Sequence, residues 1–131
     1  MISEKSRVCQ YLALVKNYAN SEFVLSPRSK NYEFLFAWGL SLDDVKGVVM
    51  ALQAKDYIEG PCKDDKDLGR SDVWIFGKTV QIESSTVDVY IKVTISKAEN
   101  GLGCLCISFH ESEYPLHYAF GGEQREAYLL P

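Results

Sequence analysis

Two alternating segments on either side of Asn100-Gly101 constrain the fold of this chain most strongly. Every second residue from Val87 to Ile95 is apolar, and residues 103–109 alternate in the same way. Because successive side chains of a strand point to opposite faces, each segment predicts a strand with one apolar face. Asn-Gly favours a tight turn, so we expect the two strands to pair antiparallel and to turn their polar rows to one open face.

The polar rows of this hairpin define a candidate functional surface. The first row includes Tyr90 and Lys92. The alternation predicts a second row of Cys104, Cys106, Ser108 and His110. An imidazole that titrates near neutral pH would then lie at a strand end beside a phenol and an ammonium group, which is typical of acid–base sites. The alternative is that His110 is an ordinary half-exposed residue at the end of a strand.

Three segments before the hairpin have helical signals. Residues 3–20 carry an amphipathic stripe with Ser3 as a candidate N-cap, and residues 32–38 are followed by Gly39, a residue that favours helix ends. The third helix begins at Ser41-Leu42-Asp43-Asp44, which has the spacing of a capping box. These signals predict an α+β fold with N-terminal helices on one face of a twisted, mainly antiparallel sheet. Residues 1–131 form a single domain, and residues 121–131 are expected to be a peripheral tail.

The composition limits the classes of function. The chain has 131 residues, 47% of them hydrophobic, with no run long enough to span a membrane and no signal-peptide pattern. We therefore expect a cytoplasmic protein with no membrane partner. The net charge of −4 argues against wrapping nucleic acid over the whole surface, so an anionic ligand needs a local basic pocket.

Metal binding has weak support in the sequence. The four cysteines form no Cys-x-x-Cys pair and are expected to be free thiols, with zinc on Cys104, Cys106 and a histidine as the alternative. The aspartates of residues 63–71 lack the order of a calcium loop, which favours a solvated surface loop. We expect no metal and no other cofactor.

Further residues could complete the candidate surface as a site that cleaves RNA. Lys92 and Lys78 are expected to stabilise a phosphorane charge, and exposed Trp74, Phe76 or Tyr114 to stack on a single-stranded base. Arg28 and Lys30 are candidates for flanking phosphates or an exposed solvated pair. His117 either folds back over the site or packs against Tyr118 and Phe120.

Several short motifs, in this order and spacing, resemble one protein family. They are Arg28-Ser29-Lys30-Asn31, Asp56-Tyr57-Ile58-Glu59-Gly60-Pro61, Asp72-Val73-Trp74-Ile75-Phe76-Gly77-Lys78, Val89-Tyr90-Ile91-Lys92 and Ile107-Ser108-Phe109-His110. Across residues 8–120 the chain resembles the motility quorum-sensing regulator (MqsR) toxins of type II toxin–antitoxin systems. The resemblance implies a RelE-like fold, related to that of microbial ribonucleases. It also implies an enzyme that cleaves single-stranded mRNA and is neutralised by a cognate antitoxin protein.

The resemblance also implies roles for individual residues. A family tyrosine falls on Tyr90, and a C-terminal lysine of the family falls on His110. Two other family positions, a lysine and a glutamine, fall near Glu59 and Ile75 and are not kept. The leading hypothesis is a metal-independent endoribonuclease (mRNA interferase) toxin. The alternative is a non-catalytic binding or inhibitory module that keeps the toxin fold and acts through a protein partner.

Overall fold

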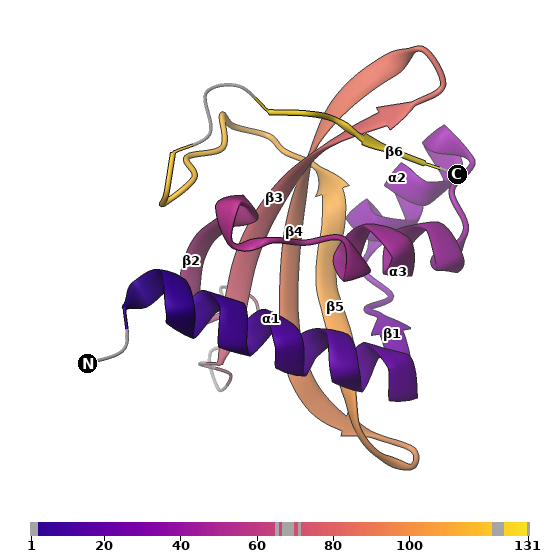
Figure 1. The fold of residues 1–131 in the computed structure, drawn as a ribbon. Coiled ribbons are helices and arrows are strands. Elements are labelled where there is room, and N and C mark those ends of the chain that lie inside the picture. The colour runs from indigo at the N-terminus through magenta and orange to yellow at the C-terminus, as the bar shows by residue number, and fades with distance from the viewer. Residues whose placement is uncertain (1–2, 65, 67–69, 71, 122–124, 131) are drawn as a thin grey trace.

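The computed structural model describes residues 3–64, 66, 70, 72–121 and 125–130, which form an α+β fold (Figure 1). The helices are α1 (Glu4–Ser21), α2 (Ser29–Trp38), α3 (Leu42–Met50) and the 3₁₀ turn η1 (Ala54–Asp56). The strands are β1 (Phe23–Leu25), β2 (Tyr57–Cys62), β3 (Val73–Ile82), β4 (Ser85–Ala98), β5 (Gly101–Glu111) and β6 (Tyr128–Leu129). The α+β class expected from the sequence is confirmed. Among the described residues, no helix is both long and apolar enough to cross a membrane.

The helix ends follow the capping residues. The Ser3 side chain accepts a hydrogen bond from the backbone N–H of Ser6, and Ser41 forms a reciprocal capping box with Asp44. Each contact satisfies backbone N–H groups that the first turn of a helix leaves without a partner. Gly39 ends α2 in the left-handed region at φ 65°, which a residue without Cβ adopts at little cost. The predicted N-caps of α1 and α3 and the predicted end of α2 are confirmed, whereas α2 begins at Ser29, three residues before the predicted start of its helical segment.

The sheet is mixed, with strand order β1-β5-β4-β3-β2 and with β6 also paired to β3. The pairs β2/β3, β3/β4 and β4/β5 are antiparallel, whereas β1/β5 and β3/β6 are parallel. The predicted hairpin is present, with its turn one residue earlier than expected: Ala98 pairs with Gly101, so Glu99 and Asn100 form the turn. Parallel neighbours at β1 and β6 come from segments far away in the sequence, which local patterns do not reveal.

Helices α1 and α3 lie against one face of the sheet and bury its apolar residues (Figure 1). Trp74 is part of this core. Its ring stacks on Tyr11 of α1, with centroids 4.1 Å apart and planes 10° apart, and the residue is 8% exposed. Phe76 is fully buried on the same face. The expectation that Trp74 or Phe76 is exposed to stack on a base was therefore wrong, because both side chains fill the space between sheet and helix.

A β-bulge changes which face β5 presents along its length. Tyr90 pairs with His110 and Lys92 with Ser108, but Val93 already pairs with Cys106, so Ile107 is an extra residue. Because of this extra residue, the alternation of side chains before the bulge is shifted by one residue relative to the alternation after it. Residues that would share a face in a regular strand therefore lie on opposite faces. Cys104 and Cys106 thus lie in the core beside Ile95 and Val93 rather than in the row of Ser108 and His110. Their predicted place on the open face was wrong.

Asn31 of α2 holds this bulge in place. Its side chain is fully buried and donates through Nδ2 to the carbonyl oxygens of Ser26 and Ile107, each at 3.0 Å. Its Oδ1 accepts from the backbone N–H of Phe109 at 2.8 Å. A strand at a bulge leaves backbone groups without ladder partners, and Asn31 supplies those partners from outside the sheet. The asparagine therefore fixes the register that puts Ser108 and His110 on the open face.

The C-terminal segment returns to the domain instead of remaining peripheral. Tyr128 and Leu129 of β6 pair with Val80 and Gln81 of β3. Arg125 forms an ion pair with the buried carboxylate of Asp56. The expectation of a peripheral tail was wrong for residues 125–130, because a strand pairing and a buried charge pair anchor them.

Candidate functional site

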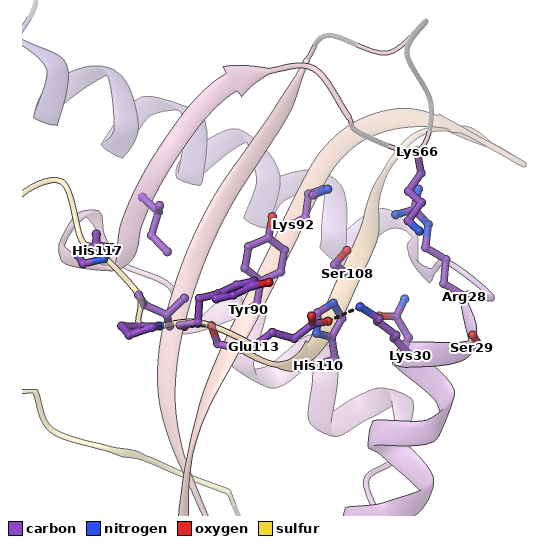
Figure 2. Close-up of a pocket in the computed structure, with 16 residues that line it drawn as sticks. Arg28, Ser29, Lys30, Lys66, Tyr90, Lys92, Ser108, His110, Glu113 and His117 are labelled. Carbon is purple, nitrogen blue, oxygen red and sulfur yellow. Dashed lines mark hydrogen bonds and ion pairs between the residues drawn. The ribbon is translucent and has the colours of Figure 1, made fainter.

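A cavity of about 720 Å³ opens on the face of the sheet away from α1 (Figure 2). Its walls come from β4, β5, the start of α2, Ile58 of β2, and the segment after β5. The lining residues include Arg28, Ser29, Lys30, Asn31, Lys66, Tyr90, Lys92, Ser108, His110, Ser112, Glu113, Tyr114, Pro115, Leu116 and His117. Four of these are cationic and one is acidic, so this acidic protein carries a locally basic concave surface.

Tyr90 and His110 form the centre of the cavity floor. They are paired residues of β4 and β5, and their rings stack with centroids 5.5 Å apart and planes 25° apart. Lys92 continues the row, with Nζ 5.9 Å from the Tyr90 ring centroid. The strand pairing thus brings together the phenol, the imidazole and the ammonium group predicted to share one face.

The ring nitrogens of His110 are placed differently. Nδ1 lies 3.0 Å from the carbonyl oxygen of Glu111. A neutral imidazole that donates through Nδ1–H to this carbonyl carries its lone pair on Nε2. His110 is half-buried, so the ring is reachable from the cavity while its neighbours restrict its orientation. This arrangement suits a group that accepts a proton from a bound hydroxyl.

Asp64 joins two of the cavity's cations. Its Oδ1 accepts from Lys92 Nζ at 3.1 Å, and its Oδ2 accepts from Arg28 Nη2 at 2.9 Å. Burial on its own would raise the pKa of this carboxyl, but the hydrogen bonds from Lys92 and Arg28 outweigh it and lower the pKa to about 2. The expectation of a solvated loop was wrong for Asp64, because the residue is 1% exposed. A run of charged residues carries no signal that one member reaches inward to a partner distant in sequence.

The segment after β5 folds back over the sheet and forms the outer wall. Ser112 N–H donates to the Asp88 carbonyl, and Ala119 N–H donates to the Tyr57 carbonyl. A Cβ at Gly77 would lie 2.7 Å from Leu116 Cδ1, so the absence of a side chain there lets the segment approach β3 closely.

Three side chains of this outer wall face the candidate site. Glu113 forms an ion pair with Lys30 of α2, drawn as a dashed line in Figure 2. The pKa of the Glu113 carboxyl is lowered by the hydrogen bond from Lys30. His117 lines the cavity, in agreement with the first of its two predicted placements, and Tyr114 is 78% exposed at the rim. Of the three aromatic residues proposed for base stacking, Tyr114 is therefore the one in position.

Lys78 does not belong to the cavity. It pairs with Val89 on the helix-facing side of the sheet, where Nζ lies 2.9 Å from Asp56 Oδ2 and 3.3 Å from the carbonyl oxygen of Ala51. Asp56 is fully buried and also binds Arg125. The proposed role of Lys78 in phosphate stabilisation was wrong, because its charge is used inside the core, on the other side of the sheet.

The two family positions that are not kept and the cysteines of the zinc alternative also lie outside the cavity. Glu59 is exposed on β2 and does not line the cavity, whereas its neighbour Ile58 does. Ile75 pairs with Lys92 and so occupies the open face without contributing a polar group. The bulge puts Cys104 and Cys106 on the other face of β5 from His110, and burial raises the pKa of the Cys104 thiol to about 12. Within the described part of the chain, no three His, Cys, Asp or Glu side chains gather as a metal site.

Comparison with protein-family models, with curated proteins and with solved structures gives no significant match for this chain. The family resemblance therefore remains a prediction, and a function is inferred from the residues of the cavity.

Proposed function

We propose that this chain is an endoribonuclease toxin of the MqsR type with a RelE-like fold, which cleaves single-stranded mRNA without a metal ion. The observation that carries the proposal is the Tyr90–His110 stack beside Lys92, on the floor of a cationic cavity. The first step of metal-independent cleavage removes the proton of a ribose 2′-hydroxyl, and Nε2 of His110 can accept it. The 2′-oxygen then attacks the adjacent phosphorus, which places additional negative charge on the phosphoryl oxygens.

Positive charge on the cavity floor suits the phosphorane that this attack forms. Lys92 stabilises the phosphorane, and the Tyr90 hydroxyl positions one of its oxygens. The P–O5′ bond breaks as the 5′-oxygen takes a proton from a second acid, for which the cavity offers Tyr90 or His117. The products are a 2′,3′-cyclic phosphate and a 5′-hydroxyl. Arg28 and Lys30 at the start of α2 bind flanking phosphates, and Tyr114 at the rim stacks on a base.

The biological part of the proposal is that a cognate antitoxin protein neutralises this activity in the cytoplasm. Expression in a bacterial host tests it. Wild type is expected to arrest growth and degrade mRNA, and co-expression of an antitoxin encoded by the neighbouring gene is expected to restore growth. His110→Ala and Tyr90→Phe are expected to abolish toxicity, whereas Tyr32→Phe, a matched change at an exposed tyrosine of α2, retains it. Growth unaffected by wild type, together with intact RNA, would refute the toxin assignment.

One observation favours the alternative of a non-catalytic module that acts through a protein partner. Lys92 and Arg28 share the Asp64 carboxylate, and Lys30 pairs with Glu113, so the cavity's positive charge is partly neutralised within the protein. A stoichiometric complex recovered by affinity purification, with no RNA cleavage at any protein concentration, would support this alternative. Loss of that complex on Lys30→Glu would map it to the cavity.

A further inference from the structure

Asp64 is the only described acidic side chain that contacts two cations lining the cavity. It follows β2, and its two oxygens are divided between Lys92 of β4 and Arg28 at the start of α2. The backbone fixes the carboxylate as well, because Asp64 N–H donates to the Arg70 carbonyl and Lys66 N–H donates to Asp64 Oδ1. Two separate elements are thus connected through one rigid group.

The carboxylate lies behind the cavity wall rather than in it. Arg28 and Lys92 line the cavity, but Asp64 does not. Its side chain is 2% exposed, that of Lys92 is 7% exposed, and that of Arg28 is 30% exposed. A substrate phosphate would therefore meet the two cations from the open side, with the carboxylate on their far side. This is the position of a group that orients others and does not itself touch substrate.

A buried ammonium group needs such a partner. Desolvation favours loss of its proton unless a nearby negative charge stabilises the charged form. The carboxyl of Asp64, with its pKa lowered to about 2, stays ionised throughout the neutral range. Arginine, in contrast, keeps its charge without help.

We infer that Asp64 is a positioning residue of the site, which keeps Lys92 charged and holds Lys92 and Arg28 together as a two-cation clamp for a phosphodiester. This inference deepens the proposed function and, for the cleavage part, rests on it. It assigns a working role to a residue that contributes no atom to the cavity wall.

The variant Asp64→Asn keeps the shape of the side chain and removes the charge. Single-turnover cleavage of a short single-stranded RNA is measured from pH 6 to pH 9 for wild type, Asp64→Asn and Asp64→Asn/Lys92→Arg. We expect Asp64→Asn to lose up to about 10²- to 10³-fold in rate at the alkaline end and much less at pH 6, since loss of one stabilising donor costs about that factor. Lys92→Arg in the same background is expected to restore the pH profile of wild type, because the guanidinium stays protonated across this range.

The matched control is Asp72→Asn, which neutralises an exposed carboxylate paired with Arg70 at 3.7 Å. It is expected to change neither the rate nor its pH dependence. If Asp64→Asn lowers the rate equally at every pH and Lys92→Arg gives no rescue, Asp64 has only a structural role and the inference is refuted. Urea unfolding of each variant identifies any loss that comes from instability.

A second measurement separates this inference from the proposed function. Inorganic phosphate is titrated into isotope-labelled wild type and Asp64→Asn, and the amide shifts of residues 90–92 and 108–110 are followed. We expect wild type to bind phosphate at pH 8 and Asp64→Asn to bind at least several-fold more weakly. If wild type cleaves no RNA but shows this difference, the proposed reaction fails and the cation clamp stands. If the two proteins bind phosphate equally, or neither binds, the clamp is refuted.

Discussion

Replacing Asn31 with alanine tests how the open face acquires its functional residues. The substitution removes three hydrogen bonds, to the carbonyls of Ser26 and Ile107 and from the N–H of Phe109. A buried hydrogen bond contributes about 1 kcal/mol net, and the groups left behind lose their partners, so the free energy of unfolding is expected to fall by about 3 kcal/mol. For a domain of this size that is a large part of a total of roughly 5–15 kcal/mol.

Urea unfolding followed by tryptophan fluorescence measures this loss. With a slope of about 2 kcal/mol per molar urea, the midpoint is expected to fall by about 1.5 M with the slope unchanged. Tyr32→Ala, at the next and exposed position of α2, is the matched control and is expected to change stability by less than about 1 kcal/mol. A loss below about 1 kcal/mol for Asn31→Ala would show that the bulge does not depend on this side chain.

Three further predictions concern the core and the buried charges. Arg125→Ala is expected to lower the free energy of unfolding by about 2–4 kcal/mol in thermal or urea denaturation, because it leaves fully buried Asp56 with Lys78 as its remaining cation. The control Lys97→Ala, at an exposed lysine, is expected to change the free energy of unfolding little. Trp74→Ala is expected to cost about 3–5 kcal/mol by the same measurement, since it empties the space between β3 and α1; a loss under 1 kcal/mol would contradict its core placement. The folded-state pKa of Asp64, about 2, lies below its ordinary value of 3.8. Its contribution to stability is therefore complete above about pH 4 and is lost as the pH falls from about 4 to 2. Acid unfolding of Asp64→Asn is expected to lack this pH-dependent loss of stability.

The parts of the fold that could be predicted are those set by neighbouring residues. Ser3, the Ser41–Asp44 box and Gly39 define helix ends through contacts within one turn. The turn signal of Asn100-Gly101 and the alternation on either side of it predict the antiparallel β4/β5 pairing. In each case a single local interaction decides the structure, so the pattern in the sequence is sufficient.

The parts that could not be predicted depend on contacts between distant segments. The bulge in β5 is stabilised by an asparagine of α2, and without it the period-two pattern puts Cys104 and Cys106 on the wrong face. In β3 the run Val73-Trp74-Ile75-Phe76 is apolar at every position, so no alternation shows which face Trp74 and Lys78 occupy. Asp64 and Arg125 lie in segments rich in charge, and only the tertiary structure shows which of those charges are buried.

The most direct test of the proposed function is the chemistry of the cleaved ends. Purified wild type is incubated with single-stranded RNA in EDTA, in parallel with an RNA that is 2′-deoxy at the cleavage site and with the variant His110→Ala. We expect wild type to give 2′,3′-cyclic phosphate and 5′-hydroxyl ends, by mass spectrometry, and to leave the deoxy substrate intact. His110→Ala is expected to be slower by about 10²–10⁴-fold, as for loss of a general base. Cleavage of the 2′-deoxy substrate, or a His110→Ala rate equal to that of wild type, would contradict the assignment of this cavity as an active site.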